Sequence, residues 1–176
     1  MVSCDQCVVS KKTQDEVREL VKSKIKDFNV EKLFLNATHT HTAPNPQKSF
    51  YHDTSSDEGI MTEEEFGEFM VERVAEAAVE AWNNRKPGGV SWGLGQAVVG
   101  HNRRVEYNDG TTVMYGNTDT DRFRGLEGPS DHGVEMVFCW DKNNKLTGIV
   151  INLACPSQVV EHKYYISADL WSEVRK

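Results

Sequence analysis

The stretch Lys32-Leu33-Phe34-Leu35-Asn36-Ala37-Thr38-His39-Thr40-His41 decides the predicted fold, because an apolar run leads directly into a pair of histidines. The run predicts a β-strand, in which side chains at positions i and i+2 point to the same face. His39 and His41 are therefore expected side by side where the strand ends. Strand ends that open into loops commonly carry the functional sites of α/β proteins.

The residues before this strand predict a first strand and a helix. The first strand is expected over Val2–Val9. The pattern Thr13-Gln14-Asp15-Glu16 is typical of a capping box, and the apolar side chains behind it recur at helical spacing, which predicts a helix over residues 13–27. The order strand, helix, strand predicts a β-α-β unit with two parallel neighbouring strands.

The residues after the histidine pair predict a long loop, a second helix and several strands. The loop covers residues 43–61, and Thr62-Glu63-Glu64-Glu65 forms a second capping box that opens a helix through Trp82. Three further strands are expected over Val90–Val99, Val134–Trp140 and Leu146–Leu153, with hairpins at residues 108–110 and 141–145. We therefore expect an α/β fold, a mixed β-sheet flanked by helices, in which residues 1–176 form a single domain.

Composition narrows the class of protein. The 176 residues suffice for a substantial core, and 38% hydrophobic with 27% charged residues is ordinary for a soluble globular protein. The net charge of −7 argues against a general nucleic-acid binder. No apolar run approaches the roughly 18 residues of a membrane helix.

Both ends of the chain indicate a fragment of a longer protein. The chain begins inside a strand-like segment without a signal peptide, and residues 167–176 are typical of the opening of a helix. The longer protein could be secreted or periplasmic if its true N-terminus is missing.

Five polar residues are candidates for chemistry. His39 and His41 would suit zinc, which usually takes three protein ligands and an open position. Arg103 also follows a predicted strand, where a guanidinium can clamp a carboxylate or an oxyanion. His162, or Asp169, could supply a further ligand or orient one. Each candidate has an alternative interpretation without chemistry. The histidine pair could simply be polar residues at a strand exit, Arg103 part of a solvated basic turn, and His162 an exposed helical histidine.

Cys4 and Cys7 form a C-x-x-C pattern, which can indicate redox or metal chemistry. On a strand, however, residues i and i+3 face opposite sides, and the sequence has no second C-x-x-C. We therefore interpret both cysteines as small buried residues in strands.

The segment Thr38-His39-Thr40-His41-Thr42-Ala43-Pro44 resembles the THTHSGP/THTHSAP segment of the neutral/alkaline, non-lysosomal ceramidases. His101-Asn102-Arg103-Arg104 resembles the "INRS" segment of that family, and residues 134–154 resemble its strand pair that runs into "LNWFAVH". The resemblance spans nearly all 176 residues and corresponds to the N-terminal part of the ceramidase catalytic domain.

The resemblance implies a zinc-dependent amidase that hydrolyses an N-acyl amide such as N-acylsphingosine, a lipid-like substrate of sphingolipid metabolism. It implies that His39 is a zinc ligand, that His41 is the neighbouring active-site histidine and that Arg103 holds the substrate or its oxyanion. Where the family has its next zinc histidine, this chain has Cys155-Pro156, so that Cys155 or His162 would have to take its place.

In the family, the remaining ligands and the proposed serine nucleophile follow later in the chain, so the chain by itself is expected to be inactive. Three alternatives stay open. One is a different zinc hydrolase that uses His39, His41 and His162 or Asp169 as ligands. Another is a non-catalytic domain that binds a small polar or carbohydrate ligand, and the third is a purely structural domain in which the histidines anchor loops.

Overall fold

The computed structural model describes residues 1–46, 59–161 and 163–176, and these fall into two compact units. Unit 1 comprises Met1–Arg85 and Pro156–Lys176, and unit 2 comprises Lys86–Cys155. The expectation of a single domain over residues 1–176 stays a prediction. Within the described ranges, no helix is both long and apolar enough to cross a membrane.

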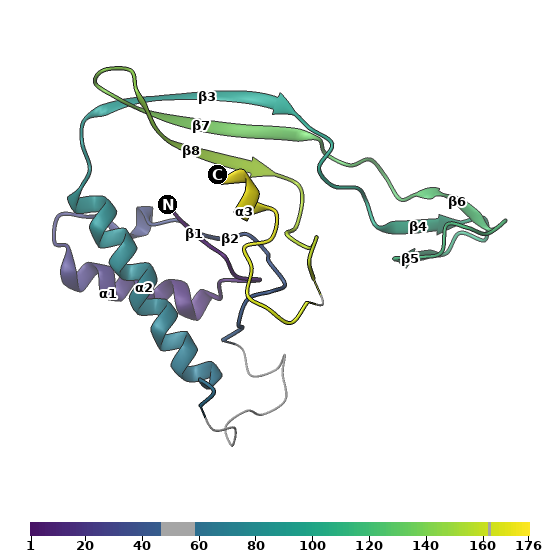
Figure 1. The fold of residues 1–176 in the computed structure, drawn as a ribbon, viewed down its shortest axis with the longest axis horizontal. Helices are drawn as coiled ribbons and strands as arrows, with labels where there is room; N and C mark the ends of the chain where they lie inside the picture. The colour runs from purple at the N-terminus through teal and green to yellow at the C-terminus, as the bar shows by residue number, and fades with distance from the viewer. Residues whose placement is uncertain (47–58, 162) are drawn as a thin grey trace. The chain divides into compact units, whose positions relative to one another are not determined.

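Unit 1 begins with the predicted β-α-β unit. Strand β1 (Val2–Cys4) pairs in parallel with β2 (Leu35–Ala37), and helix α1 (Lys11–Lys24) lies between them in sequence (Figure 1). The predicted α/β class and its β-α-β start are therefore confirmed. A single turn of 3₁₀ helix, η1 (Val30–Lys32), precedes β2.

The two parallel strands are shorter than predicted. After Cys4 the backbone turns, and the amide of Gln6 donates to the carbonyl of Cys4 at 2.8 Å instead of to a neighbouring strand. Strand β2 likewise ends at Ala37, two residues before His39. His39 has a φ of 62°, outside the β region, so the prediction of two histidines on one face of a strand is wrong.

Helix α1 starts earlier than its predicted cap. The side chain of Ser10, not that of Thr13, caps the helix, because the hydroxyl of Ser10 accepts the amide hydrogen of Thr13 at 3.1 Å. Thr13 is instead buried inside the first turn. The helix also ends earlier than residue 27, at Lys24, where Ile25 turns to extended backbone.

Helix α2 (Glu63–Asn83) has the predicted capping box. The hydroxyl of Thr62 accepts the amide hydrogen of Glu65, and the carboxylate of Glu65 accepts the amide hydrogen of Thr62 at 2.8 Å. The amide and the hydroxyl of Thr62 both donate to the Glu65 carboxylate and lower its pKa, the amide bond having the larger effect. The box fixes where α2 starts, whereas most of the loop predicted over residues 43–61 lies outside the described residues.

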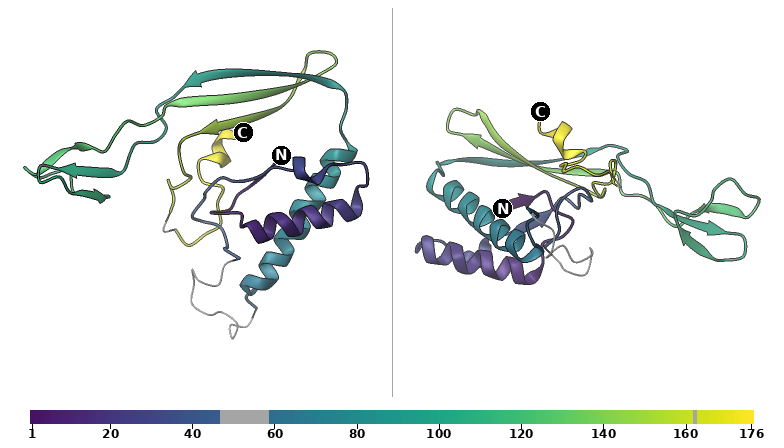
Figure 2. Two further views of the ribbon diagram at one scale, coloured as in Figure 1. Left: turned by 180° about the vertical axis from the view of Figure 1, so that it is seen from behind. Right: turned by 60° about the horizontal axis from the view of Figure 1, so that its bottom comes forward.

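The core of unit 1 lies where α1, α2 and the two strands meet. The two helices cross each other beside the β1–β2 pair (Figures 1 and 2). Val17, Val21 and Ala75 have no exposed surface, and Leu35 of β2 packs in the same cluster. Because this core anchors both strands, it also fixes the loops that leave their ends.

Unit 2 consists of two antiparallel sheets. Strands β3 (Gly88–Gln96), β7 (Gly133–Asp141) and β8 (Leu146–Leu153) form one sheet in the order β3-β7-β8. Strands β4 (Arg104–Tyr107), β5 (Thr112–Met114) and β6 (Phe123–Leu126) form the other, in the order β5-β4-β6 (Figure 1). The strands of the described residues thus form three sheets, where the sequence suggested one mixed sheet.

Both predicted hairpins are present in unit 2. The β7–β8 turn is built on Asp141, whose side chain accepts the amide hydrogens of Asn143 and Lys145 at 2.8 and 2.9 Å. The β4–β5 turn has Gly110 at a φ of 80°, a conformation that favours glycine. A short helix, α3 (Trp171–Val174), lies near the end of the chain in unit 1.

Candidate metal centre

The ends of β1 and β2 position the candidate site in unit 1. The two strands are parallel, so their carboxyl ends open at the same edge. Backbone pairing continues one step beyond them, because the amides of Thr38 and His39 donate to the carbonyls of Cys4 and Gln6, each at 3.0 Å. The loop after β1 is thereby held against the histidine segment after β2.

His39 contacts the residue that follows Gln6. Its Nδ1 lies 2.8 Å from the carbonyl oxygen of Cys7 and 3.8 Å from the Sγ of Cys7. Since a carbonyl oxygen can only accept, Nδ1 carries the ring proton and Nε2 keeps its lone pair. A backbone carbonyl that fixes the tautomer in this way is typical of metal-binding histidines.

His41 lies next to His39, with ring centroids 4.9 Å apart. Its Nδ1 is 3.4 Å from the carboxylate of Glu161, and its Nε2 is 3.1 Å from the amide nitrogen of Gln158. Gln158 also donates to Glu161 at 2.8 Å. Gln158 and Glu161, which belong to unit 1 and follow β8 in the chain, therefore orient the ring of His41. The side chain of His41 is one-third exposed.

Cys7, His39 and His41 form a group that could hold a metal ion. One donor atom from each residue lies within 4.8 Å of the others. Thiolate sulfur and imidazole nitrogen are the donors that zinc prefers. Burial raises the pKa of the Cys7 thiol in the absence of a metal, so a bound cation would have to displace its proton.

Buried hydroxyl groups hold the histidine segment in place. Thr40, fully buried between the two histidines, donates to the carbonyl of Ser167 at 2.9 Å, and Thr42 donates to the same oxygen at 3.1 Å. Ser157, also fully buried, donates to the carbonyl of Thr38 at 2.7 Å. The segment is therefore tied to the end of the chain at two separate points.

An ion pair joins the first strand to the last helical turn of the chain. The guanidinium of Arg175 donates to both carboxylate oxygens of Asp5, at 2.6 and 2.9 Å. These bonds raise the pKa of Arg175. Asp5 also accepts from the hydroxyl of Thr38 at 3.2 Å, so the pair supports the backbone just before His39.

The other predicted site residues have different positions. Arg103 lies in unit 2, where its guanidinium contacts the hydroxyl of Tyr115 and stands 5.0 Å from that ring, so its role at the histidines stays a prediction. His162 lies outside the described residues. Asp169 is buried, and its carboxylate accepts the amide hydrogens of Val160 and Leu170 at 2.8 and 2.6 Å, so it holds the backbone of its loop.

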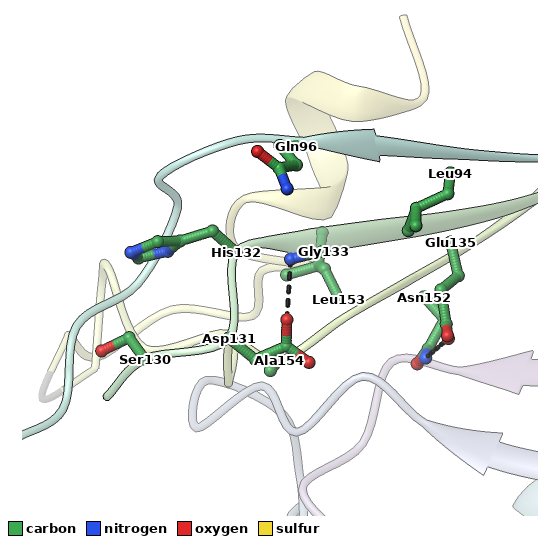
Figure 3. A pocket seen from close by; sticks show the side chains of 10 residues that line it. All are labelled: Leu94, Gln96, Ser130, Asp131, His132, Gly133, Glu135, Asn152, Leu153 and Ala154. Atoms are coloured by element: carbon green, nitrogen blue, oxygen red, sulfur yellow. Dashed lines mark hydrogen bonds between the residues drawn. The ribbon is translucent and has the colours of Figure 1, made fainter. Parts of the chain in front are cut away.

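Among the hollows on the described surface, two differ in what lines them. One, of about 560 Å³, adjoins the site and is lined by His41 together with Tyr164, Tyr165 and Ile166, which are all exposed. The other, of about 730 Å³, lies at one end of the β3-β7-β8 sheet in unit 2 (Figure 3). In the hollow of unit 2, the carboxylate of Glu135 accepts a hydrogen bond from Asn152. The hollow beside His41 instead places apolar side chains next to a candidate metal ligand.

Three residues of this site were not predicted as functional. Cys7 was interpreted as a strand residue, and the interpretation is wrong for Cys7, because the backbone leaves the strand at Cys4 and brings its side chain beside His39. Cys4 is buried in the core as expected. Glu161 and Gln158 gave no signal of their own, because they reach His41 across more than 110 residues of sequence.

Comparison with known proteins gives one kind of match. No family model and no curated protein sequence match this chain. Among solved structures, the neutral ceramidase of Pseudomonas aeruginosa matches 95% of the chain with a TM-score of 0.65 and 20% identity. A structure described as ceramidase complexed with C2 matches the same share with a TM-score of 0.64 and 19% identity.

The chain has the fold of part of a neutral ceramidase. It spans 25% of the length of each of these ceramidase chains. The resemblance that the sequence predicted is therefore confirmed for the fold.

Proposed function

We propose that this chain is the metal-binding part of a zinc-dependent amide hydrolase of the neutral ceramidase type. The observation that carries the proposal is the position of His39 and His41, 4.9 Å apart at the open end of the parallel strand pair, on a fold similar to part of neutral ceramidase. The ceramidase-like segment Thr38–Pro44 contains both rings.

In this proposal His39 binds the zinc ion through Nε2, because its Nδ1 donates to the carbonyl of Cys7. His41 stands beside it as the active-site histidine, held by Glu161. Zinc, when bound, activates a water molecule and polarises the carbonyl of the substrate amide. Arg103 is proposed to hold the substrate or its developing oxyanion.

The proposed substrate is a small or lipid-like N-acyl amide, such as N-acylsphingosine. The exposed aromatic and aliphatic side chains beside His41 support an amphipathic ligand, because they offer apolar surface at the edge of a polar site. Since the chain spans a quarter of the ceramidases, the activity is proposed for the longer protein. The proposed serine nucleophile of the family would belong to that longer protein, so no hydrolysis is expected of this chain alone.

The first test measures zinc in the purified chain by elemental analysis, in wild type and in His39→Ala. We expect one zinc per chain in wild type. In the variant, zinc affinity should fall by at least about 100-fold, because a direct ligand contributes more than a residue that only hydrogen-bonds to a ligand. His101→Ala, a histidine change in unit 2, is the matched control and should bind zinc normally.

The pH dependence provides a second readout. Protonated imidazole cannot bind a metal, so zinc affinity should fall steeply as the pH drops below about 6. A flat affinity between pH 5 and 8, or full zinc binding by His39→Ala, would contradict the proposal. Loss of zinc in His162→Ala would instead favour the zinc hydrolase that uses His39, His41 and His162. A folded full-length protein without zinc would favour a non-catalytic ligand-binding domain.

A further inference from the structure

We propose that Cys7 is the third protein ligand of this metal site and that His41, besides standing next to His39, is the second, so that unit 1 binds zinc without any other part of the protein. The proposal rests on the proposed function and deepens it, because it assigns a ligand that the ceramidase resemblance does not. That resemblance pointed to Cys155 or His162 for the missing ligand.

The backbone holds Cys7 opposite His39. The amide of His39 donates to the carbonyl of Gln6 at 3.0 Å, and the ring of His39 donates to the carbonyl of Cys7 at 2.8 Å. Two consecutive carbonyls of the first loop are thus bonded to one residue of the second. These two bonds place the Sγ of Cys7 beside the His39 ring, 3.8 Å from its Nδ1.

The donor distances suit closure around an ion. In a tetrahedral zinc site, neighbouring donor atoms lie about 3.4–3.6 Å apart, which follows from zinc–nitrogen and zinc–sulfur bonds of about 2.0–2.3 Å. The three donors here lie within 4.8 Å of one another, so each must move by about 1 Å or less. Side-chain torsions provide such a movement without any change in the backbone that holds the loops.

The backbone of His39 supports a functional role for this loop. A φ of 62° at a residue other than glycine is strained and persists where the surroundings impose it. Here the bonds from the amide and the ring of His39 to the Cys7 loop impose it. Such residues are concentrated at ligand-binding and active sites.

Zinc binding by Cys7, His39 and His41 exchanges one bond of the thiol for one bond to the metal. The S–H bond of Cys7 breaks, the zinc–sulfur bond forms, and the proton passes to solvent. Glu161 stays on Nδ1 of His41, and Gln158 leaves the Nε2 that turns to the metal. One thiolate and two imidazoles leave a fourth position open, and the thiolate makes the site prefer zinc to magnesium or calcium.

The experiment uses cobalt as a spectroscopic probe for zinc in the reduced, purified chain. A cobalt–thiolate bond gives an intense charge-transfer absorption in the near ultraviolet, whereas cobalt bound by histidine alone does not. We expect this band in wild type and in Cys139→Ser, a matched change at a free cysteine of unit 2. In Cys7→Ser the band should be absent, and zinc affinity should fall by more than about 100-fold.

A second measurement needs no variant and so does not depend on how Cys7→Ser folds. Zinc should slow the alkylation of Cys7 by at least about tenfold, measured by mass spectrometry of the peptide, and should leave the alkylation of Cys139 unchanged. Magnesium should protect neither cysteine.

The outcomes separate the two proposals. Cobalt binding without the charge-transfer band, or zinc binding that leaves Cys7 open to alkylation, overturns the role of Cys7 and leaves the proposed function in place. A folded chain that binds neither metal overturns both.

Discussion

The hydroxyl group of Thr40 should be worth about 2 kcal/mol to the histidine segment, and Thr40→Val tests this value. The substitution removes the hydroxyl and keeps the volume of the side chain. In the structure this hydroxyl donates to the carbonyl of Ser167 at 2.9 Å and accepts from the buried amide of Thr42 at 3.4 Å. Thr40 is fully buried, so water cannot replace these partners.

The magnitude follows from counting the groups that lose a partner. The bond to the carbonyl of Ser167 contributes about 0.5–1.5 kcal/mol net, and the buried amide of Thr42, left without its acceptor, adds about 1 kcal/mol. The carbonyl of Ser167 keeps the hydroxyl of Thr42 as a donor, so the substitution leaves no buried acceptor empty there. The expected loss is therefore about 2 kcal/mol, which corresponds to a roughly 30-fold change in an opening equilibrium.

Hydrogen exchange followed by mass spectrometry is the suitable assay, because it reports local opening within unit 1. Peptides that cover residues 38–43 and 164–170 should exchange roughly 30-fold faster in Thr40→Val, while peptides from α1 should change little. Thr40→Ser, which keeps the hydroxyl and loses a methyl group, should cost only about 0.8 kcal/mol.

Two results would refute this reasoning about Thr40. One is a change of less than about 0.5 kcal/mol in Thr40→Val, which would mean that the hydroxyl does not hold the segment. The other is an equal loss in Thr40→Ser, which would assign the effect to packing. If the reasoning holds, Thr40→Val should also weaken zinc binding, because His39 and His41 flank this position.

Two further predictions concern the core of unit 1 and a turn of unit 2. Val17→Ala should lower the free energy of unfolding by about 2–3 kcal/mol, because two buried methyl groups are lost and leave a cavity. Val159 is 77% exposed, so Val159→Ala should cost less than about 0.5 kcal/mol. Urea unfolding measures both losses, and equal losses would argue against the assigned core. Asp109 accepts hydrogen bonds from the hydroxyl and the amide of Thr111, which hold its pKa at about 2. Because this pKa lies below that of the unfolded chain, the stabilising effect on the β4–β5 turn is present above about pH 4 and is lost as the pH falls toward 2. An NMR titration of the carboxyl carbon should give a midpoint near 2 in wild type and a higher one in Thr111→Val; a wild-type midpoint near 4 would contradict the assigned bonds.

Local sequence patterns predicted the elements well where the signal is short-ranged. The capping box of Thr62 and Glu65, the helix behind it and both hairpins follow from residues within a few positions of one another. The parallel β1–β2 pair follows from the rule for strands joined by one helix. The pattern of the first helix was right, but its start was not, because Ser10 and Thr13 are both good caps and only packing decided that Thr13 is buried.

The sequence by itself determined the α/β class, the order of the elements and the two histidines that make this site a candidate for zinc binding. The tertiary structure alone decided which side chains join them. Cys7 comes beside His39 because the loop after β1 is bonded to the loop after β2, 32 residues later in the chain. Glu161 and Gln158 reach His41 from the far end of the chain in the same way. The physical reason is that spacing along the chain encodes periodicity within an element, whereas a metal site depends on the distances between loops that the packed core brings together.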